Sequence, residues 1–188
     1  MNTILVIVLG LLAVIAILVV MAISIFNNLV RLQALMQEAW SGIDVQLKRR
    51  FDLIPSLVAT VKQYAGHEEK IFQEVARLRS SYMQATTIDQ KIAAEAGMQG
   101  VLKTLFAVAE NYPTLKANEN FMSLQKELSS LEHEIQLARR YYNGAARNYN
   151  SAIATFPTSL IASFGSFNRV SYFEVTDAQQ REHPGVKF

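Results

Sequence analysis

Cysteine is absent from the 188-residue chain, and proline and glycine are scarce, with four and eight copies. The lack of cysteine excludes disulfides, thiolate metal sites and a cysteine nucleophile. Scarce proline and glycine leave few positions at which a helix must end. The chain is also rich in Ala, Leu, Glu, Gln, Lys and Arg, which is typical of long helices. We therefore expect an all-α protein.

The motifs that mark a catalytic or metal centre are missing as well. The histidines His67, His133 and His183 do not belong to a His-Glu-x-x-His motif. None of them follows a glutamate by three residues, as carboxylate-bridged metal bundles require. The sequence contains neither a glycine-rich phosphate loop followed by Lys-Ser/Thr nor a Gly-x-Ser-x-Gly elbow. We therefore predict no catalytic, cofactor-binding or metal-binding residues.

Charge is missing from the first 30 residues. The run from Ile4 through Leu12 and Ile17 to Phe26 is apolar apart from one serine. As a helix it would be roughly 34 Å long, enough to cross a hydrocarbon core of about 30 Å with its backbone amides satisfied internally. We therefore predict that residues 1–27 form a transmembrane anchor, with a lipid bilayer as partner.

A cleaved signal peptide is the alternative, because Ala22-Ile23-Ser24 resembles a small-x-small cleavage site. The apolar run is too long for a signal core and no basic residue precedes it, so a retained anchor is the stronger interpretation. Arg31 and Lys48-Arg49-Arg50 lie only on the C-terminal side of the run. The positive-inside bias therefore predicts a short external N-terminus and a cytoplasmic helical domain.

Residues 28–65 carry an apolar stripe at steps of three and four, typical of an amphipathic helix that continues the anchor without a linker. The stripe comprises Leu29, Leu32, Met36, Ala39, Trp40, Ile43, Leu47, Phe51, Ile54, Val58, Val61 and Ala65. Pro55 removes a backbone donor inside this helix, so we expect a kink or a restart near Leu53. We interpret Trp40 as a large buried anchor.

Further helices are predicted at 67–85, at 88–112 and at 119–156. Asn118 is a natural N-cap for the last of these, with Glu119 in its first turn. This helix repeats apolar residues, Ala138 among them, over roughly five heptads, until Pro157 ends it. Together with the 28–65 helix, it predicts an elongated antiparallel bundle of about four helices over residues 28–157.

Residues 158–188 form a short tail after the bundle. Its apolar part runs from Leu160 to Phe167, includes Phe164, and is too short to span a membrane. We expect this segment to pack on the bundle. Contact with the membrane or with a neighbouring subunit is the alternative.

Two basic groups, Lys48-Arg49-Arg50 and Arg139-Arg140, lie on the long predicted helices. We expect them on solvated faces, paired with Asp44, Asp52 or glutamates. Contact with anionic lipid headgroups or with an acidic partner is the alternative. The net charge of +2 is close to balance, so we expect no nucleic-acid partner.

Several long strings of residues resemble the LemA family, and they follow in order along nearly the whole chain. They are the segment from Asn28 to Pro55 with Glu38-Ala39-Trp40-Ser41-Gly42-Ile43-Asp44, then Tyr112-Pro113 through Phe121, Ala138-Arg139-Arg140-Tyr141-Tyr142-Asn143, Tyr149-Asn150, Phe156-Pro157 and Tyr172-Phe173-Glu174. The resemblance implies a bacterial single-pass protein of the cell (inner) membrane with a cytoplasmic helical domain. It implies no enzymatic activity and supplies no catalytic residues.

The resemblance and the two long apolar stripes together favour a membrane-anchored helical scaffold that self-associates. A magnetosome-associated branch of the family implies a role in organising a membrane or membrane proteins. An adaptor for a membrane protease or a stress pathway is the alternative. A metal-binding or catalytic bundle is the weaker alternative, with ligands drawn from Glu38, Glu95, Glu127 and His67.

Overall fold

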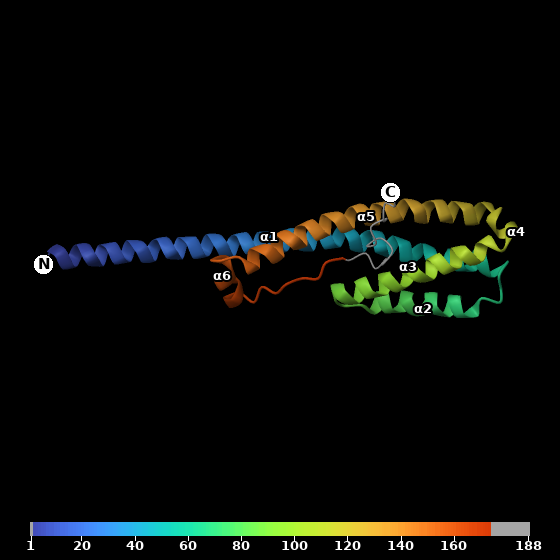
Figure 1. Cartoon of the computed structure of the whole chain (residues 1–188), viewed down its shortest axis with the longest axis horizontal. Helices are drawn as coiled ribbons and strands as arrows, with labels where there is room; N and C mark the ends of the chain where they lie inside the picture. Colours follow the sequence, from blue (N-terminus) through green and yellow to red (C-terminus); the bar gives the residue numbers. More distant parts are fainter. Residues whose placement is uncertain (1, 174–188) are drawn as a thin grey trace, which may run out of the picture. The chain divides into compact units, whose positions relative to one another are not determined.

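The computed structural model describes residues 2–173, and all regular structure within that range is helical. The helices are α1 (Asn2–Lys62), α2 (Glu69–Gln84), α3 (Ile88–Glu110), α4 (Pro113–Lys116), α5 (Glu119–Ala154) and α6 (Thr158–Phe164), as Figure 1 shows. The predicted all-α class is confirmed, and so is the direct continuation of the apolar run into the first bundle helix. The part of the predicted tail from residue 174 on lies outside the described residues.

The buried face of α1 follows the predicted stripe through most of its length. Its buried members are Leu29, Met36, Ala39, Ile43, Leu47, Phe51, Ile54, Leu57 and Val61. After Ile54 the stripe advances by three residues, so Leu57 takes the buried position that the prediction assigned to Val58. Trp40 lies beside the buried Ala39 and is only partly buried, with its ring edge-on to Tyr142 at a centroid distance of 5.4 Å. It packs at the edge of the core and not inside it.

The chain divides into two compact units. The anchor unit comprises residues 1–42 and 140–172, and the bundle unit comprises residues 43–139 together with the chain from 173 onward. Both α1 and α5 contribute residues to each unit, so their contacts are described within one unit at a time.

A small apolar core lies between α1, α5 and α6 in the anchor unit. Its buried members are Leu29, Tyr149, Ile153 and Ala162, surrounded by the partly buried Ile25, Leu32, Ala152, Ile161, Phe167 and Val170. The sequence does not predict a helix in the tail, yet α6 forms and places Ala162 in this core. The apolar part of the tail therefore packs within the anchor unit.

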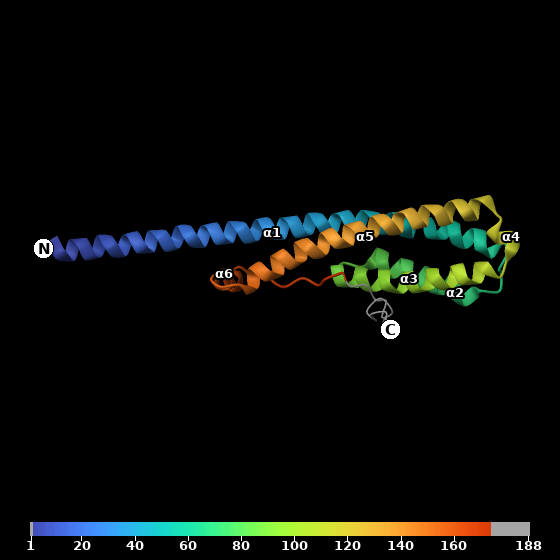
Figure 2. The same cartoon turned by 45° about the horizontal axis from the view of Figure 1, so that its top comes forward.

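In the bundle unit, α2 and α3 lie side by side in both views (Figures 1 and 2). Phe51 of α1 stacks on Tyr82 of α2, with ring centroids 4.1 Å apart. The Tyr82 hydroxyl donates to Oδ1 of Asp44 at 2.7 Å, and Nζ of Lys91 on α3 binds the same oxygen at 2.6 Å. An aromatic pair contributes about 0.5–1.5 kcal/mol beyond its buried area, so this cluster helps to join three helices.

Side-chain caps mark the starts of two helices. Oδ1 of Asn118 accepts a hydrogen bond from the backbone N–H of Phe121 at 3.0 Å, as the predicted N-cap requires, and Glu119 lies in the first turn of α5. At the start of α3, Thr87 and Gln90 form a capping box, in which each side chain accepts from the other residue's backbone N–H. Both caps satisfy N–H groups that lack partners within the helix.

Pro55 does not cause the predicted restart, because α1 passes through it as one helix. Pro55 has no N–H, so the carbonyl of Phe51, four residues earlier, loses its helical partner. Arg79 of α2 supplies a donor instead: its Nε donates to the Phe51 carbonyl at 3.4 Å, and Nη2 lies 3.8 Å from Asp52. The neighbouring helix thus compensates for the backbone bond that the proline removes.

We predict that Arg79→Met destabilises the full chain by about 1 kcal/mol, the usual net value of one hydrogen bond. The loss should shrink in a Pro55→Ala background, which restores the helical N–H, and a double-mutant cycle by urea unfolding in detergent measures the difference. Arg77→Met is the matched control on the same helix. Arg77 is largely exposed and binds Glu74 one turn away, so we expect no measurable change. If Arg79→Met lowered the free energy of unfolding equally in both backgrounds, Arg79 would not be compensating for the bond that Pro55 removes.

Candidate functional site

The N-terminal part of α1 exposes an unbroken apolar surface. Ile4, Leu12, Ile17 and Phe26 are 70%, 56%, 66% and 43% exposed. The most apolar window of this helix has a mean hydropathy of 3.5, and none of it is buried, so it is a candidate membrane span. α3 is also long and apolar enough, but a third of its window is buried and it carries the buried Glu95, as in the core helix of a bundle.

α6 turns its largest apolar side chains outward. Phe164 is 88% exposed and Leu160 is 54% exposed, while Phe156, just before the helix, is 76% exposed. Fully burying such a side chain typically contributes about 1.5–3 kcal/mol, and contacts within residues 2–173 give these side chains only part of that. Exposed apolar side chains grouped on one short element are typical of a surface that meets lipid or another protein.

Phe167 brings the chain back to α1 after α6. Its ring meets the edge of Phe26, with centroids 5.6 Å apart and an interplanar angle of 70°. Gly165 permits this turn, because a Cβ at that position would lie 2.5 Å from Cε2 of Phe167. Of the two phenylalanines singled out in the tail, Phe167 therefore packs on the anchor helix, whereas Phe164 faces away from the core.

The segment after α6 is held against α5 by side chains that bind its backbone. Nδ2 of Asn150 donates to the carbonyl of Val170 at 2.9 Å, and Oδ1 accepts from the Val170 N–H at 3.0 Å. The Tyr142 hydroxyl donates to the carbonyl of Ser171 at 2.7 Å. The sequence shows Asn150 only as a polar neighbour of Tyr149, so its role was not predictable from periodicity.

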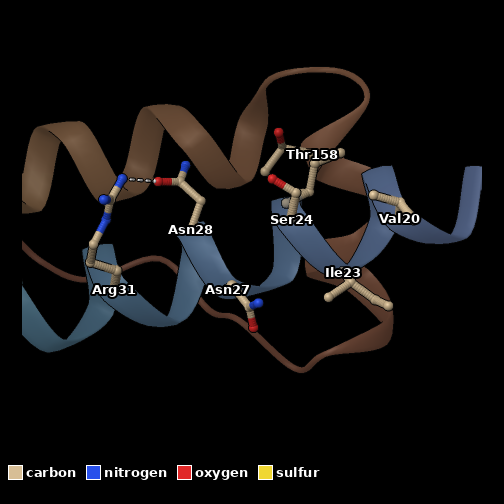
Figure 3. Close-up of a pocket in the computed structure, with 8 residues that line it drawn as sticks. Val20, Ile23, Ser24, Asn27, Asn28, Arg31 and Thr158 are labelled. Carbon is tan, nitrogen blue, oxygen red and sulfur yellow. Dashed lines mark hydrogen bonds between the residues drawn. The ribbon is translucent and has the colours of Figure 1, made fainter. Parts of the chain in front are cut away.

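A groove lies beside the C-terminal end of the apolar run (Figure 3). It has a volume of about 670 Å³ and is lined by Val20, Ile23, Ser24, Ile25, Asn27, Asn28, Arg31 and Thr158. Nη2 of Arg31 donates to Oδ1 of Asn28 at 2.7 Å, so the guanidinium is directed toward the N-terminal side of its own Cα. The groove therefore combines apolar walls with a cation and several polar groups.

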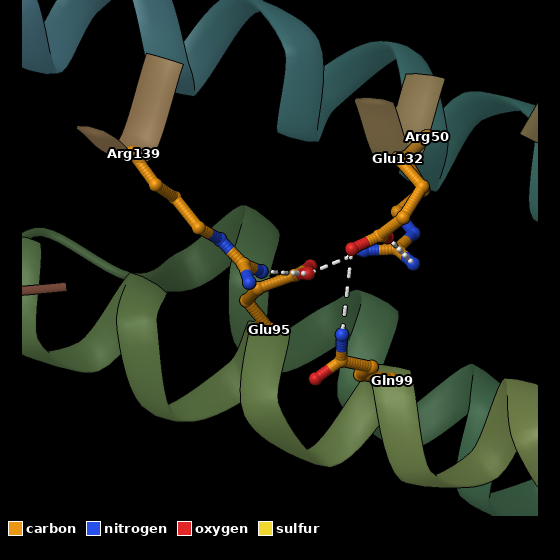
Figure 4. A network of polar contacts seen from close by, with 5 residues as sticks. All are labelled: Arg50, Glu95, Gln99, Glu132 and Arg139. Atoms are coloured by element: carbon orange, nitrogen blue, oxygen red, sulfur yellow. Dashed lines mark hydrogen bonds and ion pairs between the residues drawn. The ribbon is translucent and has the colours of Figure 1, made fainter. Parts of the chain in front are cut away.

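The bundle unit contains a buried ionic cluster built by three helices (Figure 4). Arg50 comes from α1, Glu95 from α3, and both Glu132 and Arg139 from α5. Oε1 of Glu95 accepts hydrogen bonds from Nη1 of Arg50 and from Nη2 of Arg139, the second at 3.0 Å. Nη2 of Arg50 donates to Oε2 of Glu132 at 2.6 Å, and Gln99 approaches the other oxygen of Glu132 at 3.5 Å. Two arginines and two glutamates leave no net charge.

Burial dominates the electrostatics of this cluster. Glu95 is completely buried, and Arg50 and Arg139 are 5% and 7% exposed. Burial raises the pKa of the Glu95 carboxyl, while both guanidinium groups act against that rise by favouring the ionised form. Burial lowers the pKa of Arg139, whose guanidinium also lies 4.4 Å from the ring centroid of Phe173. A carboxylate that accepts hydrogen bonds from guanidinium groups on two other helices joins those helices to its own.

The predicted solvated position is wrong for two of the four singled-out arginines. Arg50 and Arg139 are buried in the cluster, whereas the neighbouring arginines are exposed: Arg49 and Arg140. The predicted stripe of the last helix included Ala138, but the buried face passes through position 139, four residues after the buried Ile135. Hydropathy favours alanine over arginine at a core position, and only the carboxylate from another helix makes the arginine acceptable there.

The residues of the metal-binding alternative do not come together. Glu95 is buried and bound by two arginines, and the remaining three are exposed: Glu38, Glu127 and His67. Within residues 2–173, no group of three or more His, Asp or Glu side chains is arranged to hold a metal ion. The described part of the chain therefore offers no support for that alternative.

We predict that Glu95→Gln destabilises the chain by about 3–5 kcal/mol, because it leaves two buried arginines with a single carboxylate. Thermal unfolding of the full chain in detergent measures the loss. Glu127→Gln is the matched control on an exposed position of α5, and we expect it to change stability by no more than about 0.5 kcal/mol. Similar effects of the two substitutions would show that the cluster does not hold the helices together.

Sequence comparison relates the chain to known proteins. It is 25% identical over 175 residues to magnetosome protein MamQ 2 of Paramagnetospirillum magneticum, and over 174 residues to magnetosome protein MamQ of Magnetospirillum gryphiswaldense. Both matches cover 79% of this chain, which spans 64% of the length of these relatives. Protein LemA of Metamycoplasma hominis is 28% identical over 159 residues, covering 82% of this chain and 71% of that protein. A model of the LemA family matches residues 39–188, so the chain belongs to the LemA family.

Proposed function

We propose that the chain is a membrane-anchored helical scaffold of the LemA type, without enzymatic activity, that self-associates and organises a membrane or membrane proteins. The observation that carries this proposal is α1, a single helix of 61 residues that begins as an exposed apolar segment and continues into the bundle unit without a linker. A direct helical connection limits how far the attached helices can move away from the bilayer, since it lacks the freedom of a flexible linker.

In this proposal the chain has three functional parts, whose bounds differ from those of the two compact units. Residues 1–27 are the membrane anchor, residues 28–157 are the helical bundle, and residues 158–188 are a tail that contacts the bundle, the membrane or a neighbouring subunit. The exposure of Leu160 and Phe164 supports a contact beyond the chain itself. Two further apolar side chains of the anchor unit, Leu35 and Tyr141, are 42% and 60% exposed on α1 and α5. They support self-association through these helices.

We place the protein in a bacterial inner membrane, with a short external N-terminus and the helices in the cytoplasm. Arg31 follows the apolar run directly, and the fold adds three exposed arginines to the same unit: Arg140, Arg147 and Arg169. This excess of positive charge supports the cytoplasmic side. Two of the relatives are named as magnetosome proteins, and for this chain that name supports a role in organising a membrane.

We predict that the full chain stays in the membrane pellet after carbonate extraction of cells that express it. Leu12→Arg combined with Ile17→Arg should release it into the soluble fraction, because each arginine at the centre of a span costs roughly 2.5–3.5 kcal/mol of insertion free energy. Leu12→Ile combined with Ile17→Leu is the matched control and should be retained like the original chain. Extraction of the original chain by carbonate would contradict the anchor.

Self-association predicts that the chain in mild detergent has a mass above the 21.1 kDa of one chain, rising with concentration in sedimentation or light-scattering measurements. Tyr141→Glu should lower that mass, because a charge on an apolar contact is costly to desolvate. Gln136→Glu introduces the same residue at another exposed position of α5 and should leave the mass unchanged. A strictly monomeric chain that co-purifies with a membrane protease would instead favour the adaptor.

A further inference from the structure

The groove of Figure 3 continues into a second hollow along the apolar run. The second hollow has a volume of about 550 Å³ and is lined by Ala16, Ile17, Val20, Met21, Ser24 and Ile25. The two hollows share Val20, Ser24 and Ile25, and apart from Thr158 all their lining residues lie on α1, so they form one shallow, open groove along the exposed face of that helix. One end is almost wholly apolar, while the other carries amide, hydroxyl and guanidinium groups.

The polar end of the groove brings together several side chains that can donate hydrogen bonds. Arg31 presents its guanidinium there, and the hydrogen bond to Oδ1 of Asn28 directs it toward the groove and toward the apolar run. Because Oδ1 is the acceptor in that bond, the amide N–H groups of Asn28 point elsewhere and can donate to a ligand. Thr158, at the start of α6, lines the groove from the other helix and adds a hydroxyl group. Guanidinium, amide and hydroxyl donors of this kind suit a phosphate group.

The charge of the anchor unit favours an anionic ligand. Its basic side chains are Arg31, Arg140, Arg147 and Arg169, and Glu38 is its acidic side chain, which gives four minus one, or +3. The remaining 14 basic and 15 acidic residues give −1 for the rest of the chain (18 − 4 and 16 − 1). The near balance of charge in the whole sequence therefore hides a basic unit that includes the candidate membrane span.

We propose that the groove binds one anionic phospholipid, with its phosphate at Arg31 and Asn28 and an acyl chain along Ile17 and Met21. The groove spans the end of the uncharged run, which is the depth at which a lipid changes from acyl chain to headgroup. A free phosphate ion would use only the polar end, and a protein segment would not explain why the apolar end lies on the membrane span. The proposal rests on the anchoring proposed above.

The test counts lipids that stay bound to the full chain by native mass spectrometry in a neutral detergent. Phosphatidylglycerol and phosphatidylcholine with identical acyl chains are titrated separately. We expect one phosphatidylglycerol to bind selectively. Arg31→Gln should weaken the affinity for this lipid about fivefold, which is the contribution of one basic residue near an anionic lipid surface. Arg140→Gln is the matched control, because it removes an exposed arginine of the same unit that does not line the groove.

The apolar end is tested by Ser24→Phe, which fills the groove where the two hollows meet and leaves Arg31 in place. We expect this substitution to weaken the binding of phosphatidylglycerol as much as Arg31→Gln does. Gly10→Phe adds the same ring to the apolar run at a position where a Cβ would have no neighbour within 4 Å, and it should bind lipid normally. Inorganic phosphate at millimolar concentration should not displace the lipid.

Three results would contradict the proposed phospholipid site. They are equal binding of the two lipids, equal losses for Arg31→Gln and Arg140→Gln, and displacement by inorganic phosphate, which would indicate a simple anion site. Failure of the proposed membrane anchoring would be seen separately, because carbonate extraction tests it without any lipid titration. A chain that stays in the membrane pellet but shows no lipid preference contradicts only this inference.

Discussion

The continuity of α1 from the apolar run into the bundle unit is the constraint on which the other features depend. A segment that lies in lipid must satisfy its amides internally, so the apolar run has to be helical. No proline occurs between that run and Pro55, and by then the helix already carries the buried residues of both units. At Pro55, Arg79 binds the carbonyl that the proline leaves without a helical partner. The apolar run and the buried residues of α1 therefore belong to one helix.

The two units use charge in opposite ways. In the bundle unit, Glu95 accepts from two arginines and Glu132 from one of them, so the buried charges compensate each other. Burying charges is costly, and such a cluster contributes little net stability, but removing one member leaves an uncompensated charge in the core. In the anchor unit the arginines are exposed and outnumber the single glutamate, so their charge is available to an anionic surface.

Local patterns predicted the elements well, and failed where a contact comes from another part of the chain. The cap at Asn118, the break at Thr86-Thr87 and the end of the last long helix before Pro157 all follow from the residues themselves. The core position of Arg139 does not, because it depends on a carboxylate 44 residues away in the sequence. The helix α6 is likewise too short to be stable alone, and it forms where Ala162 joins the small core that also contains Leu29 and Tyr149.

By itself, the sequence determined that this protein is helical, that its first segment can span a bilayer, and that it belongs to the LemA family. These properties depend on composition, periodicity and length, which are local. Only the tertiary structure decided which arginines are buried, where the tail lies, and which polar groups line the groove beside the apolar run. Those outcomes depend on contacts between distant segments, and helical periodicity does not specify which face meets which partner.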